Sequence, residues 1–122
     1  MRAVLLGLLV AALGAGNADA QKNESANFMV PVCKKWLAGS GAKDAEGLQL
    51  IFDAGVCSGT ISTLTHVREL VLPDFRSCWQ QGATWGQSIR VALAYIEARP
   101  ERMHEDFRDL VLEAWHEAWP CK

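Results

Sequence analysis

Apolar residues recur every three or four positions in four stretches of the chain, and this spacing places them on one face of an α-helix. The first stretch ends at Gly39-Ser40-Gly41, and its stripe is Phe28, Met29, Val32, Trp36 and Leu37. The second covers residues 45–71, and its stripe is Leu48, Ile51, Phe52, Gly55, Val56, Gly59, Leu64, Val67 and Val71. Gly55 and Gly59 stand four residues apart, so they share a face on which another helix could approach closely.

The other two stretches follow an irregular segment at residues 72–83, where Pro73, Gly82 and several polar residues predict a loop. Thr84 stands three residues before Gln87, which is the spacing of a helix-capping box. The third stripe is Trp85, Ile89, Leu93 and Ile96.

Pro100 ends the third helix near Arg99 and suits the first position of a fourth helix. The stripe of this last helix is Met103, Phe107, Leu110, Val111, Ala114 and Ala118, with Trp115 and Trp119 beside it. Four amphipathic helices predict an all-α fold, a small four-helix bundle. The chain has 122 residues, 50% of them hydrophobic and 21% charged, which is typical of one folded domain.

The first twenty residues have the pattern of a secretory signal peptide. Met1-Arg2 is a short positive start, and the apolar run at residues 3–15 is shorter than the roughly 20 residues that cross a bilayer as a helix. Ala18-Asp19-Ala20 supplies the small residues that signal peptidase recognises. We therefore predict cleavage after Ala20, a single mature domain at residues 21–122 and no stable membrane anchor.

Export changes the interpretation of the four cysteines, Cys33, Cys57, Cys78 and Cys121. An even number of cysteines in a small exported domain predicts two disulfides, for which three pairings are possible. The sequence has no CxxC pair, and none of its three histidines has a second His or Cys at helical spacing. We therefore expect no metal ion and no cofactor.

The charge pattern argues against nucleic acid as a partner. The formal net charge is -2, and the basic residues are scattered along the chain. Proteins that follow a phosphate backbone need clustered Lys and Arg.

Two groups of residues are candidates for catalysis. Ser58, Ser62 and Thr63 come near His66, yet a regular helix offers neither an exposed strained nucleophile nor an oxyanion hole. The last helix also carries acidic residues among Arg102 and Arg108, which is typical of a solvated helix face more than of a paired general acid and base. These acidic residues are Glu101, Glu105, Asp106, Asp109, Glu113 and Glu117. We expect no catalytic residue.

Aromatic residues point to a binding surface instead. The chain has five tryptophans, and aromatic side chains are enriched at interfaces. Trp79 is the best interface candidate, because it lies in the irregular segment.

Several short motifs resemble the Rap/Tai immunity family. They are Cys57-Ser58-Gly59-Thr60-Ile61, Gln87, Tyr95-Ile96-Glu97-Ala98-Arg99-Pro100-Glu101 and the closing Ala118-Trp119-Pro120-Cys121. The resemblance covers about nine tenths of the mature chain, from Cys33 onward.

The resemblance implies a periplasmic, all-helical, disulfide-bonded protein, often a homodimer. Such a protein binds and inhibits a peptidoglycan amidase effector of a type VI secretion system by covering its Cys/His pair. We expect residues 72–83 to form part of the binding segment, with Pro73, Asp74, Phe75, Arg76, Trp79 and Gln80 as effector-binding residues. Of the three disulfide pairings we favour Cys33 with Cys57, which would join neighbouring helices, and Cys78 with Cys121, which would fasten this segment to the C-terminus.

Two alternatives belong to other functional classes. A small periplasmic chaperone of the acid-stress type is likewise helical, exported and disulfide-bonded, and it would expose apolar surface when its carboxylates are protonated. The third hypothesis is a hydrolytic enzyme, but the sequence offers no credible set of catalytic residues for it.

Overall fold

The computed structural model describes residues 24–39 and 45–122. These residues form the α-helices α3 (Ala26–Leu37), α4 (Ala45–Val67), α5 (Trp85–Glu97) and α6 (Phe107–Ala118) and two 3-10 helices, η1 (Pro73–Phe75) and η2 (Pro100–Arg102). The predicted all-α fold is confirmed. The predicted leader at residues 1–20, and Ser40 and Gly41 of the predicted first helix end, lie outside the described residues.

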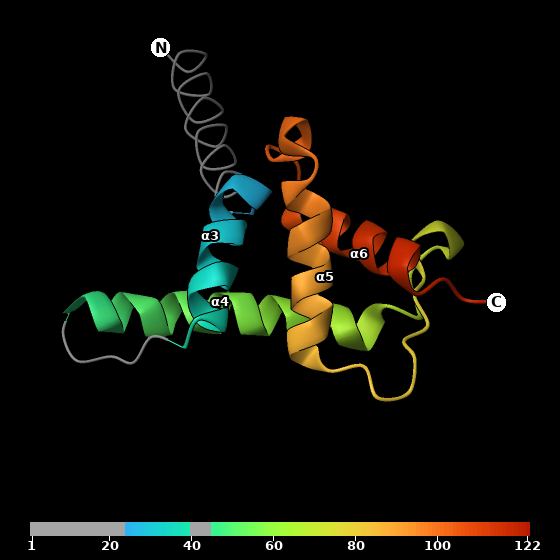
Figure 1. The fold of residues 1–122 in the computed structure, drawn as a ribbon, viewed down its shortest axis with the longest axis horizontal. Coiled ribbons are helices and arrows are strands. Elements are labelled where there is room, and N and C mark those ends of the chain that lie inside the picture. Colours follow the sequence, from blue (N-terminus) through green and yellow to red (C-terminus); the bar gives the residue numbers. More distant parts are fainter. Residues whose placement is uncertain (1–23, 40–44) are drawn as a thin grey trace, which may run out of the picture.

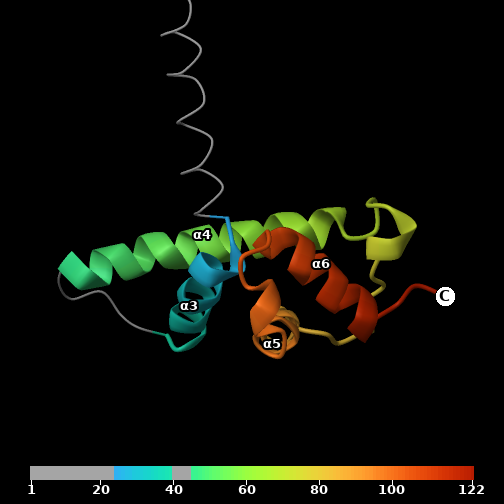
Figure 2. The ribbon, with the colours of Figure 1, turned by 90° about the horizontal axis from the view of Figure 1, so that it is seen from above.

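The helices are arranged around α4, which runs along the length of the molecule (Figure 1). Helices α3 and α5 cross it side by side, and the view from above places α3, α5 and α6 on the same side of α4 (Figure 2). No helix among the described residues is long and apolar enough to span a bilayer.

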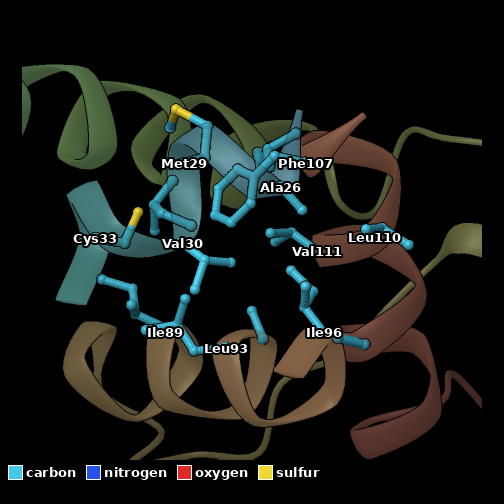
Figure 3. Packing of buried hydrophobic residues seen from close by; sticks show 14 of the residues in the cluster. Ala26, Met29, Val30, Cys33, Ile89, Leu93, Ile96, Phe107, Leu110 and Val111 are labelled. Carbon is cyan, nitrogen blue, oxygen red and sulfur yellow. The ribbon is translucent and has the colours of Figure 1, made fainter. Parts of the chain in front are cut away.

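The core lies where these three helices meet α4 (Figure 3). From residue 47 onward, where the burial of its side chains is described, α4 contributes only Cys57, Ile61 and Leu64 to the buried hydrophobic residues. The other helices contribute more, and their largest buried side chains are Trp115, Phe107, Ile89, Ile96, Leu110 and Val111. The core therefore covers one part of α4 and leaves the rest of that helix outside.

Side-chain caps fix the starts of α5 and α6. The Thr84 hydroxyl accepts a hydrogen bond from the Gln87 backbone N–H at 3.2 Å, as the capping-box spacing predicts. The Asp106 carboxylate accepts one from the Arg108 backbone N–H at 2.8 Å.

Two predicted helix boundaries were wrong. The second helix ends at Val67 and not at residue 71. The last helix begins at Phe107, because Pro100 opens only the short η2. The chain then turns so that the carbonyl oxygens of Met103 and Glu105 accept hydrogen bonds from the first backbone N–H groups of α3, at 2.7 and 3.0 Å.

The predicted apolar stripe of α4 is only partly covered. Leu48 is 69% exposed and Phe52 67%, because α4 extends past α3 at its N-terminal end (Figures 1 and 2). A Cβ atom built on Gly55 or Gly59 would meet nothing within 4 Å, so the expected close approach of a helix there is absent from the described part of the chain.

The face of α6 also differs from the prediction. Trp115 is completely buried, and its indole N–H donates a hydrogen bond to the Ser88 carbonyl oxygen at 2.9 Å. Ala118, predicted on the inner face, is exposed. Compared with the prediction, the side of α6 that faces the core therefore includes Trp115 and excludes Ala118.

Both predicted disulfides are present. Cys33–Cys57 joins α3 to α4, and Cys78–Cys121 joins the irregular segment to the end of the chain. Their Cα atoms are 5.3 and 4.9 Å apart.

Candidate functional site

The segment after α4, residues 70–80, forms an end of the molecule and is called the tip segment here. Its short helix η1 lies at the opposite end of the fold from the start of α4, and it projects beyond α5 and α6 (Figures 1 and 2). The predicted effector-binding residues all fall in this segment.

Local hydrogen bonds shape the tip segment. Pro73 occupies the first position of η1, where its missing N–H is no loss. The Phe75 backbone N–H donates to the Leu72 carbonyl oxygen at 2.9 Å, and Arg76 Nε donates to the Val71 carbonyl oxygen at 3.0 Å. The segment is therefore a compact turn, although it is not a regular helix.

Further contacts fasten this turn to α6. The Cys78 backbone N–H donates to the Trp119 carbonyl oxygen at 2.8 Å, next to the disulfide between Cys78 and Cys121. His116 Nδ1 donates to the Arg76 carbonyl oxygen at 2.7 Å. A segment held at several points loses little conformational entropy when it binds a partner.

Trp79, the predicted interface residue, is partly buried against two other tryptophan rings. Its ring centroid lies 5.0 Å from that of Trp115 in an edge-on arrangement and 5.5 Å from that of Trp119. The guanidinium carbon of Arg68 lies 4.8 Å from the centroid of the Trp79 ring. Trp79 is thus partly buried and anchors the tip segment to the core, which the local sequence could not indicate.

The exposed side of the tip segment is formed by other residues. Pro73, Asp74, Arg76 and Gln80 are exposed, as an effector-binding role requires, and Phe75 is partly buried. Two leucines that were not predicted as binding residues are more prominent, since Leu70 is 80% exposed and Leu72 71%. Leu70 lies just beyond the end of α4, within the stretch predicted as helix but outside its predicted apolar face.

A hollow of about 400 Å³ lies beside this exposed side. The tip segment and α6 form its walls, and the residues that line it are Leu70, Val71, Leu72, Phe75, Asp109 and Leu112. Five of these six residues are hydrophobic, so Asp109 is the charged group of an otherwise apolar surface.

Partial burial, followed by repulsion from Asp106, raises the pKa of Asp109 above its usual range. Its sequence neighbour Arg108 is engaged elsewhere, because its guanidinium pairs with Asp106 at 2.6 Å and with Glu24 at 2.8 Å. No ion pair within the described part of the chain involves Asp109.

The remaining acidic residues of this region are mostly engaged by arginines. Arg102 donates to both carboxylate oxygens of Glu113, at 2.6 and 3.0 Å, and also pairs with Glu105 at 2.6 Å. These hydrogen bonds from Arg102 are the main reason why the pKa values of Glu113 and Glu105 are lowered. Glu113 and Glu105 are therefore held ionised, which does not favour either as a general acid.

The hydroxyl residues near His66 are also engaged by the backbone. The Ser58 hydroxyl donates to the Gly55 carbonyl oxygen, and the Thr63 hydroxyl donates to that of Gly59. His66 Nδ1 donates to the Ser62 carbonyl oxygen at 2.8 Å and not to a hydroxyl group. Among the described residues, no group of three or more His, Cys, Asp or Glu side chains could hold a metal ion.

Comparison with known proteins gives one match. The family model of the Rap1a immunity proteins matches residues 25–121. None of the curated proteins and none of the solved structures compared with the chain is significantly similar to it. The match includes α3 to α6, both disulfides and the tip segment.

Proposed function

Because this chain belongs to the Rap1a immunity protein family, we propose that it binds and inhibits a peptidoglycan amidase effector delivered by a type VI secretion system. The tip segment would enter the cleft of the amidase and cover its Cys/His pair. An inhibitor of this kind excludes the substrate and needs no chemistry of its own.

The observation that carries this proposal is the combination of exposure and anchoring in the tip segment. Leu70 and Leu72 present apolar surface to solvent, while the disulfide of Cys78 and the packed ring of Trp79 hold the backbone behind them. Apolar side chains on a preorganised support are typical of the residues that dominate binding energy at interfaces.

The place of action in this proposal is the periplasm. Two disulfides need an oxidising compartment, and the peptidoglycan that an amidase attacks lies there. The predicted leader at residues 1–20 would deliver the chain to it. Sequencing the N-terminus of the protein recovered from the periplasm should give Gln21 as the first residue, and an intact Met1 would contradict this part of the proposal.

The central experiment is affinity capture. The full chain, exported with its own leader and purified from the periplasm in the oxidised form, serves as bait for the secreted proteins of its source strain. We expect mass spectrometry to identify a small Cys/His amidase whose wall-degrading activity the purified protein abolishes. Failure to capture such an amidase, or capture without inhibition, would contradict the proposal.

A matched pair of variants then tests the tip segment. In Leu70→Ser/Leu72→Ser the apolar surface of the tip is removed, whereas Phe28→Ser removes an exposed apolar side chain of α3, outside both the tip segment and α4. Exposed substitutions of this kind usually change the free energy of unfolding by about 0.5 kcal/mol or less. We expect inhibition of the amidase to weaken about a hundredfold in the first variant and to stay unchanged in the second.

A second part of the proposal is that the protein is a homodimer that associates through α4. Leu48, Phe52, Gly55 and Gly59 follow one another at helical spacing on an exposed face of this helix. The two glycines leave room for a second helix, and the two large residues supply apolar area to bury.

Light scattering across a range of protein concentrations measures the oligomeric state. We expect a dimer for the unmodified protein and a monomer for Phe52→Glu, which places a charge on the proposed interface. A monomer for the unmodified protein would exclude the dimer and leave the amidase proposal intact.

A further inference from the structure

The hollow between the tip segment and α6 differs from the rest of the proposed binding surface because it is concave. The exposed Leu70 and Leu72 line it on the side of the tip segment, and the nearly buried Leu112 lines it on the side of α6. A protruding segment can fill the cleft of a partner, whereas a hollow must receive something from the partner. The two features together therefore predict an interface that interlocks in both directions.

The lining of the hollow restricts what can enter it. Apolar walls favour a hydrocarbon chain, because burying it removes apolar surface from water on both partners. Asp109 adds one negative charge at the side of α6, so the complementary ligand has an apolar stem and a positive end. Lysine and arginine side chains have this construction, with a hydrocarbon stem below a charged head.

The charge of Asp109 is available to a partner. Arg108 is already shared between Asp106 and Glu24, and Arg102 pairs with Glu105 and Glu113. Partial burial and then repulsion from Asp106 disfavour the charged form of Asp109 more than the nearby Arg108 favours it, and a cation from outside would offset this cost. Such relief favours a cationic partner over a neutral one.

We propose that the hollow lined by Leu70, Leu72, Phe75, Asp109 and Leu112 receives a lysine or arginine side chain of the effector, with the stem against the leucines and the charged head on Asp109. This inference rests on the proposed function for the identity of the partner. The chemistry of the hollow itself can be tested without that partner.

The first experiment uses small probes. The full chain, exported and oxidised as above, is labelled with ¹⁵N and titrated with n-hexylammonium, n-hexanol or hexanoate while the amide resonances are followed by NMR. We expect n-hexylammonium to shift the amides of Leu70, Leu72 and Asp109 with the highest affinity, and hexanoate to bind about tenfold more weakly or not at all. In Asp109→Asn the preference for n-hexylammonium over n-hexanol should disappear. Equal shifts with all three probes, or shifts confined to other residues, would overturn the proposal.

The second experiment uses the captured amidase and measures its affinity for charge variants. We expect Asp109→Asn to bind about tenfold more weakly and Asp109→Lys still more weakly, because the latter repels the cation. The control is Glu101→Lys, which makes the same change of charge in η2, well away from the tip segment (Figure 1). Thermal unfolding of each variant shows whether the fold is retained.

The outcomes separate the two proposals. If the amidase is captured and both Asp109 variants bind as tightly as the unmodified protein, the hollow does not receive a cation and this inference is wrong, while the proposed function stands. If no amidase is captured, the proposed function fails, and the probe titration still decides whether the hollow selects an apolar cation.

Discussion

The two disulfides have the same chemistry but lie in very different surroundings. Cys33 and Cys57 are completely buried and join two helices inside the core. Cys78 is exposed, and its bond to Cys121 holds the tip segment against the end of the chain. The first bond therefore belongs to the packing that makes the fold, and the second belongs to the surface that we propose as the binding site.

This difference shows that loop length alone does not decide what a disulfide contributes. The sequence separations are 24 residues for Cys33–Cys57 and 43 for Cys78–Cys121, so chain entropy alone assigns slightly more stabilisation to the second bond. The burial of the first bond and the exposed position of the second reverse this order. We expect the core disulfide to control stability and the surface disulfide to control the shape of the tip.

The largest effect is expected from Cys33→Ala/Cys57→Ala. This variant loses the loop constraint and also leaves unfilled volume between α3 and α4, so the free energy of unfolding should fall by about 4 kcal/mol. Urea unfolding in an oxidising buffer measures the change. A loss below about 1 kcal/mol would mean that the core does not depend on this bond.

A smaller loss of about 2 kcal/mol is expected for Cys78→Ala/Cys121→Ala. The tip segment and the chain end regain freedom in the folded state, which offsets part of the entropy that the unfolded state regains. Hydrogen exchange of the backbone amide at position 78, which donates to the Trp119 carbonyl oxygen in the unmodified protein, should accelerate while the amides of α5 stay protected. Equal losses of stability in the two double variants would contradict the claim that the core disulfide stabilises the fold more than the surface disulfide.

The next effect concerns the ion pair between Arg102 of η2 and Glu113 of α6. Glu113→Gln removes the charge that Arg102 contacts at 2.6 Å, so the free energy of unfolding at neutral pH should fall by about 1.5 kcal/mol. The hydrogen bonds from Arg102 lower the pKa of Glu113 below its ordinary value of 4.5. The stabilisation by the ionised Glu113 is thus fully present above that value and is lost as the pH falls through the lowered pKa in the folded state.

Urea unfolding as a function of pH measures this contribution. The difference between Glu113→Gln and the unmodified protein should shrink as the pH falls below the ordinary glutamate pKa of 4.5. The matched control is Glu117→Gln. Glu117 is more exposed than Glu113, and its contact with Arg99 is longer, at 3.4 Å. If Glu117→Gln lowers the free energy of unfolding as much as Glu113→Gln, the stabilisation cannot be attributed to the pairing of Glu113 with Arg102.

The smallest effect is expected at the start of α5, just beyond the tip segment. Thr84→Ala removes the exposed cap on the Gln87 backbone N–H and should lower the free energy of unfolding by about 0.5 kcal/mol. Thr84→Ser keeps the hydroxyl group and should stay close to the unmodified protein. If thermal unfolding shows the same loss of stability for Thr84→Ala and Thr84→Ser, the loss does not come from the missing cap.

Much of the fold could be predicted from the sequence because helical spacing is local. The stripe from Ile89 to Ile96 and the cap at Thr84 both appear in the structure. The apolar residues Leu48 and Phe52 have the same spacing but are exposed, because spacing identifies an apolar face and does not say whether another element covers it.

The candidate site was predicted less completely. The sequence located the tip segment, since Pro73 and the polar residues around it interrupt the helical pattern. Nothing in the sequence distinguishes the exposed Leu72 from the partly buried Trp79. The sequence also does not distinguish Asp109 from the other acidic residues that were predicted to lie on a solvated helix face. Only contacts between residues distant in the chain distinguish these roles.

The sequence by itself determined the helices, the cysteines available for disulfides and the position of the irregular segment, because these depend on residue types at short spacing. The tertiary structure decided which half of α4 is covered, which aromatic ring anchors the tip and where a hollow forms around Asp109. These features arise where α6 packs against residues about forty positions earlier in the chain, and such packing is set by the shape of the whole core.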